Sequence, residues 1–385
     1  MSEAGRRGPI GLGAFDAFAT DFWAFANCMR ALPNFLPPSN PELATLLSTF
    51  NSKVLLPSHL TKEQEKLVYS QESRAKLEAE PVEITLGDVT LPLEHLDRNV
   101  LPDRFHTLRA IVKDSKTAED WENVVRCLQG FEEAGIPVKG QWQEMVVRKL
   151  NLAGMQHLVL KALQRPTATG LRLSNWGLLS QVLRTVHDKA ALAGWEEEET
   201  TKALRMAKQV VELMESEEHC GRTFANPKPN QGDWRGHPVV IALPTEMAAV
   251  LAEKYGGDKE EVKKMANRLV TAIKQRDYMA SLDAIAAKST PALTDHQSRT
   301  GQRRYVMKHY LELLELIILE NALKTSRSVL GSDMPLAQES QKYEARVEEV
   351  VKNGLASMKD LAVRDGREIK SGFADYVKEM AEKSK

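Results

Sequence analysis

Residues able to form a catalytic site do not occur at the spacings that known chemistries need. The sequence contains no nucleophile elbow, Walker phosphate loop, HExxH zinc helix, paired CxxC motif or dinucleotide-binding glycine pattern. Gly8, Gly11 and Gly13 do not follow a predicted strand, so we interpret them as part of a flexible tail. His187 and Asp188 are neighbours in a predicted helix and point to different sides of it, which excludes a catalytic dyad. We therefore predict that the protein is not an enzyme, and we assign no catalytic residue.

Three further residues have the chemistry of zinc ligands. His219, Cys220 and His237 lie in and beside a stretch rich in Gly and Pro, but no fourth ligand has a recognisable spacing. The cysteines Cys28, Cys127 and Cys220 are far apart in the chain, which favours buried thiols in a reducing compartment over a disulfide scaffold. We predict no metal site and no cofactor.

The distribution of charge gives the clearest functional indication. Because the formal net charge is only -1, binding to a polyanion would require a local basic surface. Residues 139–189 contain eight basic residues against two acidic ones, whereas residues 196–218 are strongly acidic. This segregation is compatible with two arrangements: a face that binds a polyanion such as RNA, or adjacent helices that neutralise each other.

Two groups of basic residues are candidates for contacts with RNA phosphates, while DNA is not predicted as a partner. The first group lies in the basic segment and consists of Arg148, Lys149, Lys161, Arg165 and Arg172. The second group enters a predicted helix from a polar loop, with Tyr305 interleaved, and consists of Arg299, Arg303, Arg304 and Lys308. The alternative interpretation of the second group is a helix start or a contact with a protein partner.

Near the amino terminus, apolar side chains recur at steps of three and four residues and form one stripe on a predicted helix. The candidate partner-binding residues of this stripe are Phe15, Phe18, Phe22, Phe25 and Met29. The stripe can pack on the body of the protein or bind a protein partner, and a membrane surface is least favoured because the polar face lacks lysines. No stretch of 18 residues is both apolar and free of charged side chains, so no integral membrane association is predicted.

The basic segment lies in a region where three predicted helices each begin at a tryptophan and end at a glycine. These helices cover residues 121–135, 142–154 and 176–194, and each closes on Ala-Gly, which favours a helix carboxyl end. The helix ends recur at the period of a two-helix repeat. Such segments bury their apolar faces by packing on their neighbours, which predicts a stack of helical hairpins.

The flanking segments complete a predominantly helical prediction. Helices are expected over residues 61–80, 103–113, 196–217, 244–255, 258–287 and 302–328, with two more after residue 335 that break near 365–366. One β-hairpin is predicted over residues 82–93, with its turn at Gly87 and Asp88. Residues 219–237 are rich in Gly, Pro and Asn and show no periodic pattern, so we place a boundary there.

The predicted fold class is all-α: an α-solenoid-like stack of helical hairpins with one small β-hairpin. The first region is an amphipathic N-terminal helix and linker (1–58), in which residues 33–58 are rich in Pro, Asn and Ser and form the linker. The remaining regions are a helical-repeat unit with the β-hairpin (59–218), a second linker (219–237) and a C-terminal helical unit (238–385).

Segment 141–174 (QWQEMVVRKLNLAGMQHLVLKALQRPTATGLRLS) and the sequence GFEEAGIP at 130–137 have the features of a two-helix repeat. In these features the chain resembles the pentatricopeptide and tetratricopeptide helical-repeat families. The distance from Trp to Ala-Gly varies between the units, so the repeat is degenerate and no base-reading positions are transferred. The resemblance implies a mitochondrial location, with the cytoplasm as the alternative. The amino terminus contains Glu3, Asp16 and Asp21 and does not have the composition of a mitochondrial presequence.

Two functional hypotheses follow from these patterns. The first is a non-enzymatic helical-repeat interaction scaffold that binds protein partners or forms part of a larger assembly. The alternative is an organellar, mitochondrial RNA-binding helical-repeat protein that acts in RNA processing or translation. In that alternative, the two basic groups form the surface that contacts RNA.

Overall fold

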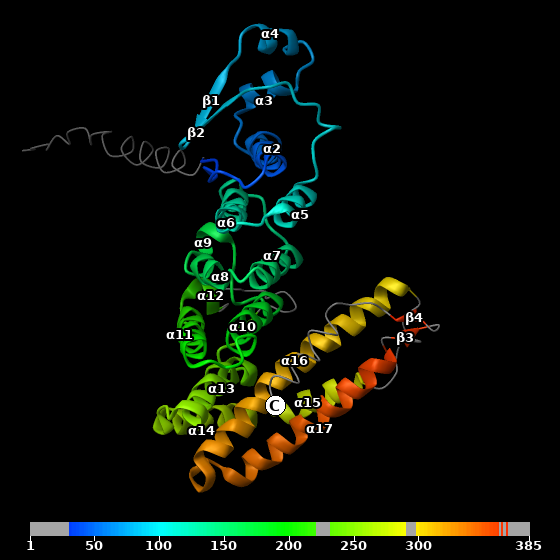
Figure 1. Ribbon diagram of the computed structural model, residues 1–385. Coiled ribbons are helices and arrows are strands. Elements are labelled where there is room, and N and C mark those ends of the chain that lie inside the picture. The colour runs from blue at the N-terminus through cyan, green and yellow to red at the C-terminus, as the bar shows by residue number, and fades with distance from the viewer. Residues whose placement is uncertain (1–30, 221–231, 290–297, 362, 365–366, 369–385) are drawn as a thin grey trace, which may run out of the picture. The chain divides into compact units, whose positions relative to one another are not determined.

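The computed structural model of the chain describes residues 31–220, 232–289, 298–361, 363–364 and 367–368, and helices dominate it (Figure 1). This confirms the predicted all-α fold class. The chain divides into two compact units. The first comprises Met1–Lys139 and Thr167–Gly170, and the second comprises Gly140–Pro166 and Leu171–Lys385. The predicted repeat unit over residues 59–218 is therefore shared between the two.

The first unit has a core of aromatic and aliphatic side chains. Phe50 and Phe131 are fully buried and meet edge to face, with ring centroids 4.9 Å apart. Leu108 and Ile111 are buried on the apolar face of α5. The elements of this unit are α2 (Pro41–Thr49), η1 (Phe50–Leu55), η2 (Leu56–Ser58), α3 (Lys62–Tyr69), α4 (Arg74–Ala79), β1 (Glu83–Leu86), β2 (Val89–Pro92), α5 (Arg104–Asp114), α6 (Ala118–Glu133) and, at its boundary, α9 (Pro166–Thr169).

The prediction of a linker over residues 33–58 is wrong from residue 41 onward, because this part is helical. Asn40 caps α2 by accepting a hydrogen bond from the backbone N–H of Leu43, and Pro41 occupies the first helical turn. Leu43 and Phe50 are buried along α2 and the π-helical η1. The Asn and Pro residues that suggested a loop mark a helix start here, and the buried apolar spacing after them maintains the helix.

A non-helical stretch ahead of α2 is held on α6 by two buried polar side chains. The carboxamide of Asn123 accepts a hydrogen bond from the Leu36 N–H at 2.8 Å and donates one to the Leu36 carbonyl at 2.9 Å. Asp120 accepts a hydrogen bond from the Ser39 N–H at 2.9 Å and two more from backbone N–H groups at the start of its own helix. Burial opposes ionisation, but these hydrogen bonds outweigh it and lower the pKa of Asp120 to about 2.

The predicted β-hairpin is confirmed. β1 and β2 pair antiparallel around a tight turn at Gly87 and Asp88. Gly87 has a φ of 65°, a left-handed conformation that glycine adopts without steric cost. The hairpin is tied to the chain that precedes α2, because the Leu32 N–H donates to the Leu86 carbonyl at 3.2 Å. A second, short strand pair, β3 with β4, was not predicted.

The second unit contains three successive helical hairpins followed by long helices. α7 packs on α8 and α10, α10 packs on α11, and α13 packs on both α11 and α14, so the hairpins follow one another in sequence order (Figure 1). The long helices α16 and α17 pack against each other, and α16 also packs on α13. The elements are α7 (Gly140–Leu152), α8 (Gln156–Leu163), α10 (Trp176–Ala191), α11 (Glu197–Leu213), α12 (Glu217–Cys220), α13 (Pro238–Tyr255), α14 (Lys259–Gln275), α15 (Tyr278–Ala287), α16 (Arg299–Leu330), η4 (Gly331–Asp333), α17 (Ala337–Leu361), β3 (Val363–Arg364) and β4 (Arg367–Glu368).

The helix ends predicted at Ala-Gly are confirmed. Gly154 has a φ of 73° and follows the end of α7, where a residue with a Cβ would be strained. The N–H of Met155 donates to the Leu150 carbonyl at 2.8 Å, which closes the last turn of the helix. Gly135 and Gly194 have the same positive φ at the ends of α6 and α10. Local sequence is therefore sufficient to stop these helices.

Two downstream helices differ from their predictions. α13 begins at Pro238 and not at residue 244, because His237 caps it and Pro244 is accommodated inside the helix. The helix expected over residues 258–287 is interrupted at Asp277, which has a φ of 46° and separates α14 from α15. A single non-glycine residue in the left-handed region breaks a pattern that remains apolar on both sides.

The stretch 219–237 does not separate the two units. Residues 221–231 lie outside the described part of the chain, but Trp234 packs on Trp176 with ring centroids 5.0 Å apart. The indole N–H of Trp234 also donates to the Ser174 carbonyl at 2.9 Å. Both contacts lie inside the second unit. Aromatic packing that the local composition does not reveal therefore fixes the end of this stretch.

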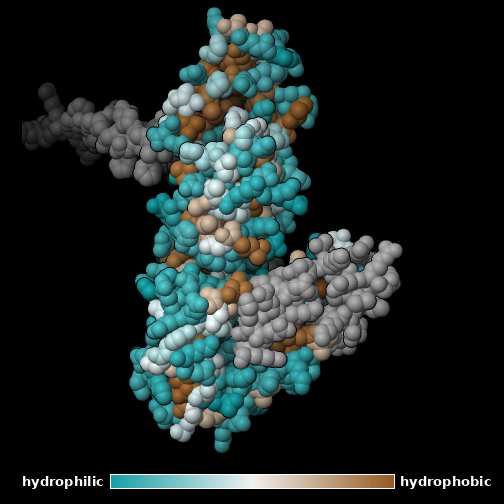
Figure 2. All heavy atoms as spheres, in the orientation of Figure 1, coloured by the Kyte–Doolittle hydropathy of each residue, from teal (hydrophilic) through white to brown (hydrophobic). Residues whose placement is uncertain are grey.

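The face of the described chain that Figure 2 shows is mainly hydrophilic. In Figure 2 hydrophobic residues, drawn in brown, reach the surface in separate patches among hydrophilic residues, drawn in teal. Large hydrophobic side chains exposed among the described residues are Val82, Val100, Leu152, Leu192, Tyr255 and Leu336. Scattered exposed residues of this kind are normal on soluble domains, so only those that recur at equivalent positions require an explanation.

Replacing Asp120 by Asn should lower the free energy of unfolding in a pH-dependent way. The folded-state pKa of Asp120 is below the ordinary value, so its contribution is fully present above about pH 4 and is lost as the pH falls through about 2. The difference between wild type and Asp120→Asn, measured by urea unfolding with circular dichroism, should therefore shrink between pH 4 and pH 2. The matched variant Glu72→Gln, at an exposed carboxylate of the same unit, should show no comparable difference at any pH. A difference for Asp120→Asn that is constant with pH would contradict this account.

Candidate nucleic-acid interface and buried ionic network

The first group of predicted RNA-contacting residues lies on α7, on α8 and in the turns after α8. Buried aliphatic side chains of α7 face its helical neighbours, which leaves the charged positions of the helix on the other side. All five cations of this group reach solvent at least in part: Lys149, Lys161 and Arg165 are exposed, and Arg148 and Arg172 are half-buried. The predicted basic surface therefore exists in the folded chain.

The acidic helix α11 neutralises one end of the basic segment. Lys189 Nζ lies 2.8 Å from Glu199 Oε2, and Lys202 of α11 itself lies 2.7 Å from Glu199 Oε1. These two lysines lower the pKa of Glu199 to about 2. Among the described residues, Arg148, Lys149 and Arg172 make no ion pair within 4 Å. Neutralisation by α11 is therefore observed at Lys189, and it does not account for the whole basic segment.

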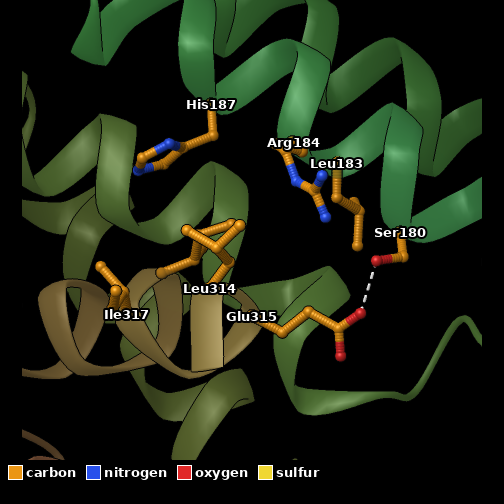
Figure 3. Close-up of a pocket in the computed structure, with 8 residues that line it drawn as sticks. Ser180, Leu183, Arg184, His187, Leu314, Glu315 and Ile317 are labelled. Atoms are coloured by element: carbon orange, nitrogen blue, oxygen red, sulfur yellow. Dashed lines mark hydrogen bonds between the residues drawn. The ribbon is translucent and has the colours of Figure 1, made fainter. Parts of the chain in front are cut away.

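Another basic residue of this segment, Arg184, belongs to the interior. It lines a small cavity of about 10 Å³ between α10 and α16, together with Ser180 and Glu315 (Figure 3). Ser180 Oγ donates to Glu315 Oε1 at 2.5 Å. Burial raises the pKa of Glu315 to about 7, against the opposing effects of the Ser180 hydrogen bond and the Arg184 charge. The cavity is too small for a substrate, so this cluster is a polar contact within the core.

The most deeply buried charges of the second unit meet one turn further along α10. His187 Nε2 lies 3.3 Å from Glu246 Oε1 of α13, and His187 Nδ1 lies 3.9 Å from Asp188 Oδ1. The expectation that His187 and Asp188 point to different sides of the helix is therefore wrong, because both side chains reach the same buried contact. Asn321 of α16 donates to Glu246 at 2.9 Å, and Asn151 of α7 donates to Asp188 at 2.5 Å. Burial opposes protonation of His187, but the two carboxylates outweigh it and raise its pKa to about 10. This buried ionic network joins α7, α10, α13 and α16.

Sequence reasoning missed both acids that lie against α10. Glu246 stands alone in the apolar stretch VVIALPTEMAAVL, and Glu315 lies in YLELLELIILE. A carboxylate on a buried helix needs a compensating partner, so acids within these largely apolar stretches are the signal that could have located the polar contacts. The partners themselves are on other helices and are not visible from local spacing.

The second group of predicted RNA-contacting residues lies at the start of α16. Arg304 and Lys308 are exposed and one helical turn apart, so they share a face. Arg299 and Arg303 belong to the same helix, and their side chains lie outside the described part. The hydroxyl of Tyr305 donates to the Lys288 carbonyl at 2.7 Å, so this ring is anchored to the end of the preceding helical segment.

The three residues considered as zinc ligands have other roles. His219 is buried, its Nδ1 accepts from the Leu173 N–H at 3.1 Å, and its Nε2 lies 2.9 Å from the Leu163 carbonyl. His237 caps α13, and burial together with the nearby Arg276 charge lowers its pKa to about 3. Cys220 is a buried free thiol. The described residues contain no group of three side chains placed to hold a metal ion.

Some predictions fall outside the described residues. The N-terminal apolar stripe, with its candidate partner-binding residues Phe15, Phe18, Phe22, Phe25 and Met29, lies in the segment 1–30. The helix break expected at residues 365–366 also lies outside. No helix in the described part of the chain has the length and apolar character needed to cross a membrane.

Helices that carry a basic surface outside and an ionic network inside suit a protein that binds a polyanion. Comparison with known proteins shows the family. The family model of the mitochondrial ribosomal protein mS27 matches residues 23–378. The small ribosomal subunit protein mS27 of Neurospora crassa is similar, with 24% identity over 308 residues that cover 77% of each chain. The chain belongs to the mitochondrial ribosomal protein mS27 family.

Family membership decides several of the sequence-based predictions. The chain is a structural component of the ribosome and not an enzyme, and its location is mitochondrial; the absence of enzymatic activity and the mitochondrial location were predicted, whereas the ribosome was not. It is part of a larger assembly, which was one element of the scaffold hypothesis. The role in mitochondrial translation named in the alternative hypothesis agrees better with the family than a general interaction scaffold does.

Removing the carboxylate of Glu246 should destabilise the second unit strongly. In Glu246→Ala the His187 cation loses its nearest carboxylate while it remains buried, so the free energy of unfolding should fall by about 3–5 kcal/mol. Glu246→Gln keeps an acceptor for Asn321 and should cost less. Chemical denaturation followed by circular dichroism measures both variants. Glu212→Ala, at an exposed acid of α11, is the matched control, and a loss for Glu246→Ala no larger than for this control would refute the network's role.

Proposed function

We propose that this chain is a component of the mitochondrial small ribosomal subunit that binds ribosomal RNA through a basic surface on α7, α8 and the turns after them. The basic surface is defined as Arg148, Lys149, Lys161, Arg165 and Arg172. The family and the Neurospora crassa relative, which is named a small ribosomal subunit protein, support the assembly. The observation that supports the RNA contact is the solvent exposure of this basic group, together with the absence of a described ion pair at Arg148, Lys149 and Arg172.

Phosphate contacts suit a protein with this charge distribution. The formal net charge of -1 provides no long-range attraction to RNA, so affinity must come from local cations that displace counterions from the RNA backbone. Lys149 and Lys161 are flexible point charges, and Arg148 and Arg172 can donate two parallel hydrogen bonds to one phosphate. Recognition of this kind follows the RNA backbone and its shape more than base identity.

The exposed pair Arg304 and Lys308 on α16 is a second candidate contact for RNA. It carries fewer described cations than the basic surface, and Tyr305 is anchored by its hydroxyl and does not offer a free ring for base stacking. A contact with a neighbouring ribosomal protein is the competing role for this pair.

We also propose that the hairpins of this chain form a degenerate helical-repeat array of the pentatricopeptide and tetratricopeptide kind. Three successive helical hairpins, α7 with α8, α10 with α11 and α13 with α14, support it, because each hairpin buries its apolar side against the next one. In such an array consecutive hairpins present equivalent positions in a row, and this provides surfaces for protein partners as well as for RNA.

Charge reversal in the basic surface tests the RNA contact. The double variant Arg148→Glu/Lys149→Glu should bind a transcript of mitochondrial small-subunit ribosomal RNA more weakly than wild type, in a filter-binding assay over a series of KCl concentrations. The slope of log K, where K is the association constant, against log salt concentration is negative. It should become shallower by about two, roughly one for each lost phosphate contact.

A matched control is available on α14, where Lys263 and Lys264 are likewise a half-buried and an exposed neighbour on one helix. Lys263→Glu/Lys264→Glu should leave both affinity and salt slope near those of wild type. Unchanged RNA binding by the Arg148→Glu/Lys149→Glu variant, or an equal loss in the control, would overturn the proposed contact.

A further inference from the structure

Three exposed apolar side chains recur at the ends of the first helices of successive hairpins. Leu152, Leu192 and Tyr255 are 67%, 46% and 43% exposed, at the carboxyl ends of α7, α10 and α13. Leu152 and Leu192 occupy the same place in two copies of the sequence Leu-Ala-Gly, and Tyr255 directly precedes Gly256. We call these three residues the turn row. Single exposed leucines need no explanation, but the exposure of Leu152 and Leu192 at one sequence position in two hairpins, with Tyr255 exposed at the end of the corresponding helix of the next hairpin, does.

The turns after Leu152 and Leu192 share one backbone geometry, and the turn after Tyr255 is a variant of it. Met155 donates its N–H to the Leu150 carbonyl and Trp195 donates to the Ala190 carbonyl, each five positions earlier, whereas Gly257 donates to the Leu251 carbonyl six positions earlier. The glycines Gly154, Gly194 and Gly256 all have positive φ. The turn row therefore lies at hydrogen-bonded helix ends that each contain a glycine with positive φ.

Hydrogen bonds place these turns side by side. Asn151 of α7 donates to Asp188 near the end of α10, and the hydroxyl of Tyr255 donates to the carbonyl of Trp195 at 2.9 Å. Trp195 itself is buried, has a φ of 61° and packs edge-on against His187, with ring centroids 5.5 Å apart. The buried ionic network thus supports the surface on which the turn row lies.

The spacing of the turn row fits a helical partner. Packed helices lie about 8–10 Å apart, and two turns of an α-helix advance about 10.8 Å. Apolar residues seven positions apart on one face of a partner helix would therefore meet successive members of the row, in the manner of a helix that docks on a hydrophobic groove.

The charge around the middle of the row selects the kind of partner. Glu196, Glu197 and Glu198 follow Leu192 directly and are exposed, and residues 190–201 contain no Lys or Arg. Lys202 pairs with Glu198 at 2.7 Å, which leaves the first carboxylates of this run for other contacts. Carboxylates in this position repel RNA phosphates and attract cationic side chains. The basic surface and the middle of the turn row therefore favour partners of opposite charge.

We infer that the turn row, Leu152, Leu192 and Tyr255 with the carboxylates Glu196 and Glu197, is a docking surface for a basic amphipathic helix of another protein. The inference rests on the proposed function, since the partner is met in the assembled ribosomal subunit. It assigns to this chain a protein-binding edge that begins at Leu152, one helical turn after Arg148 and Lys149 of the basic surface, and continues to Leu192 and Tyr255.

Thiol labelling at the row tests this docking surface in the full chain. A Leu192→Cys chain, with Cys28→Ser to remove a background thiol, is incorporated into mitochondrial small subunits, isolated by sedimentation and treated with a maleimide. The described native cysteines, Cys127 and Cys220, are buried and should not react. Cys at position 192 should be labelled in the free chain and should lose this labelling in the subunit, and the protection should persist after nuclease digestion. The added reversal Glu196→Lys/Glu197→Lys should restore labelling, whereas Glu212→Lys on the same helix should not.

Each other outcome has a defined meaning. Labelling in the subunit as fast as in the free chain shows an uncovered row and overturns the docking surface. Protection that is lost on nuclease digestion shows that RNA covers the row and overturns the protein partner. A chain that does not co-sediment with the small subunit overturns the proposed function, and this proposal with it, whereas the first two outcomes leave the proposed function in place.

Discussion

The second unit depends on the contact between the buried cation of His187 and the carboxylate of Glu246. Both side chains are almost completely buried, so neither charge can be left alone without a large desolvation cost. Asn151 and Asn321 extend the contact to two more helices. Apolar packing alone would permit neighbouring helices to slide by a turn at small cost, whereas a buried ionic contact is satisfied in one register only. The network therefore fixes how the first helices of the hairpins stand against one another.

A fixed register has consequences at the surface. It holds the ends of α7, α10 and α13 next to each other, and these helix ends carry Leu152, Leu192 and Tyr255. It also directs Lys189 to α11 while the cations of α7 and α8 stay available to solvent. A ribosomal protein must contact both RNA and protein neighbours, and separating cationic from apolar and acidic surfaces lets one helical stack serve both kinds of contact.

What the sequence could predict is what local chemistry determines. Ala-Gly stops a helix wherever it occurs, so the ends at Gly135, Gly154 and Gly194 were predicted correctly, and alternation around a Gly-Asp turn was enough for the hairpin. Errors arose where distant residues decide. Arg184 looks like a surface cation until Glu315 is placed beside it on another helix, and the stretch 219–237 looks like a linker until Trp234 meets Trp176. The candidate RNA surface was visible in the composition, but which of its cations are neutralised depends on tertiary contacts such as that of Lys189 with Glu199.

Amide hydrogen exchange of an Asn151→Ala variant, followed by mass spectrometry, tests most directly whether the ionic network couples the helices. Asn151 lies at one end of the network, on α7, and its side chain reaches Asp188 on α10. If the network unites the helices, exchange should accelerate together in α7, α10, α13 and α16, while α5 and α6 of the first unit remain unchanged. Acceleration confined to α7 would show that the helices are held independently and would contradict the account.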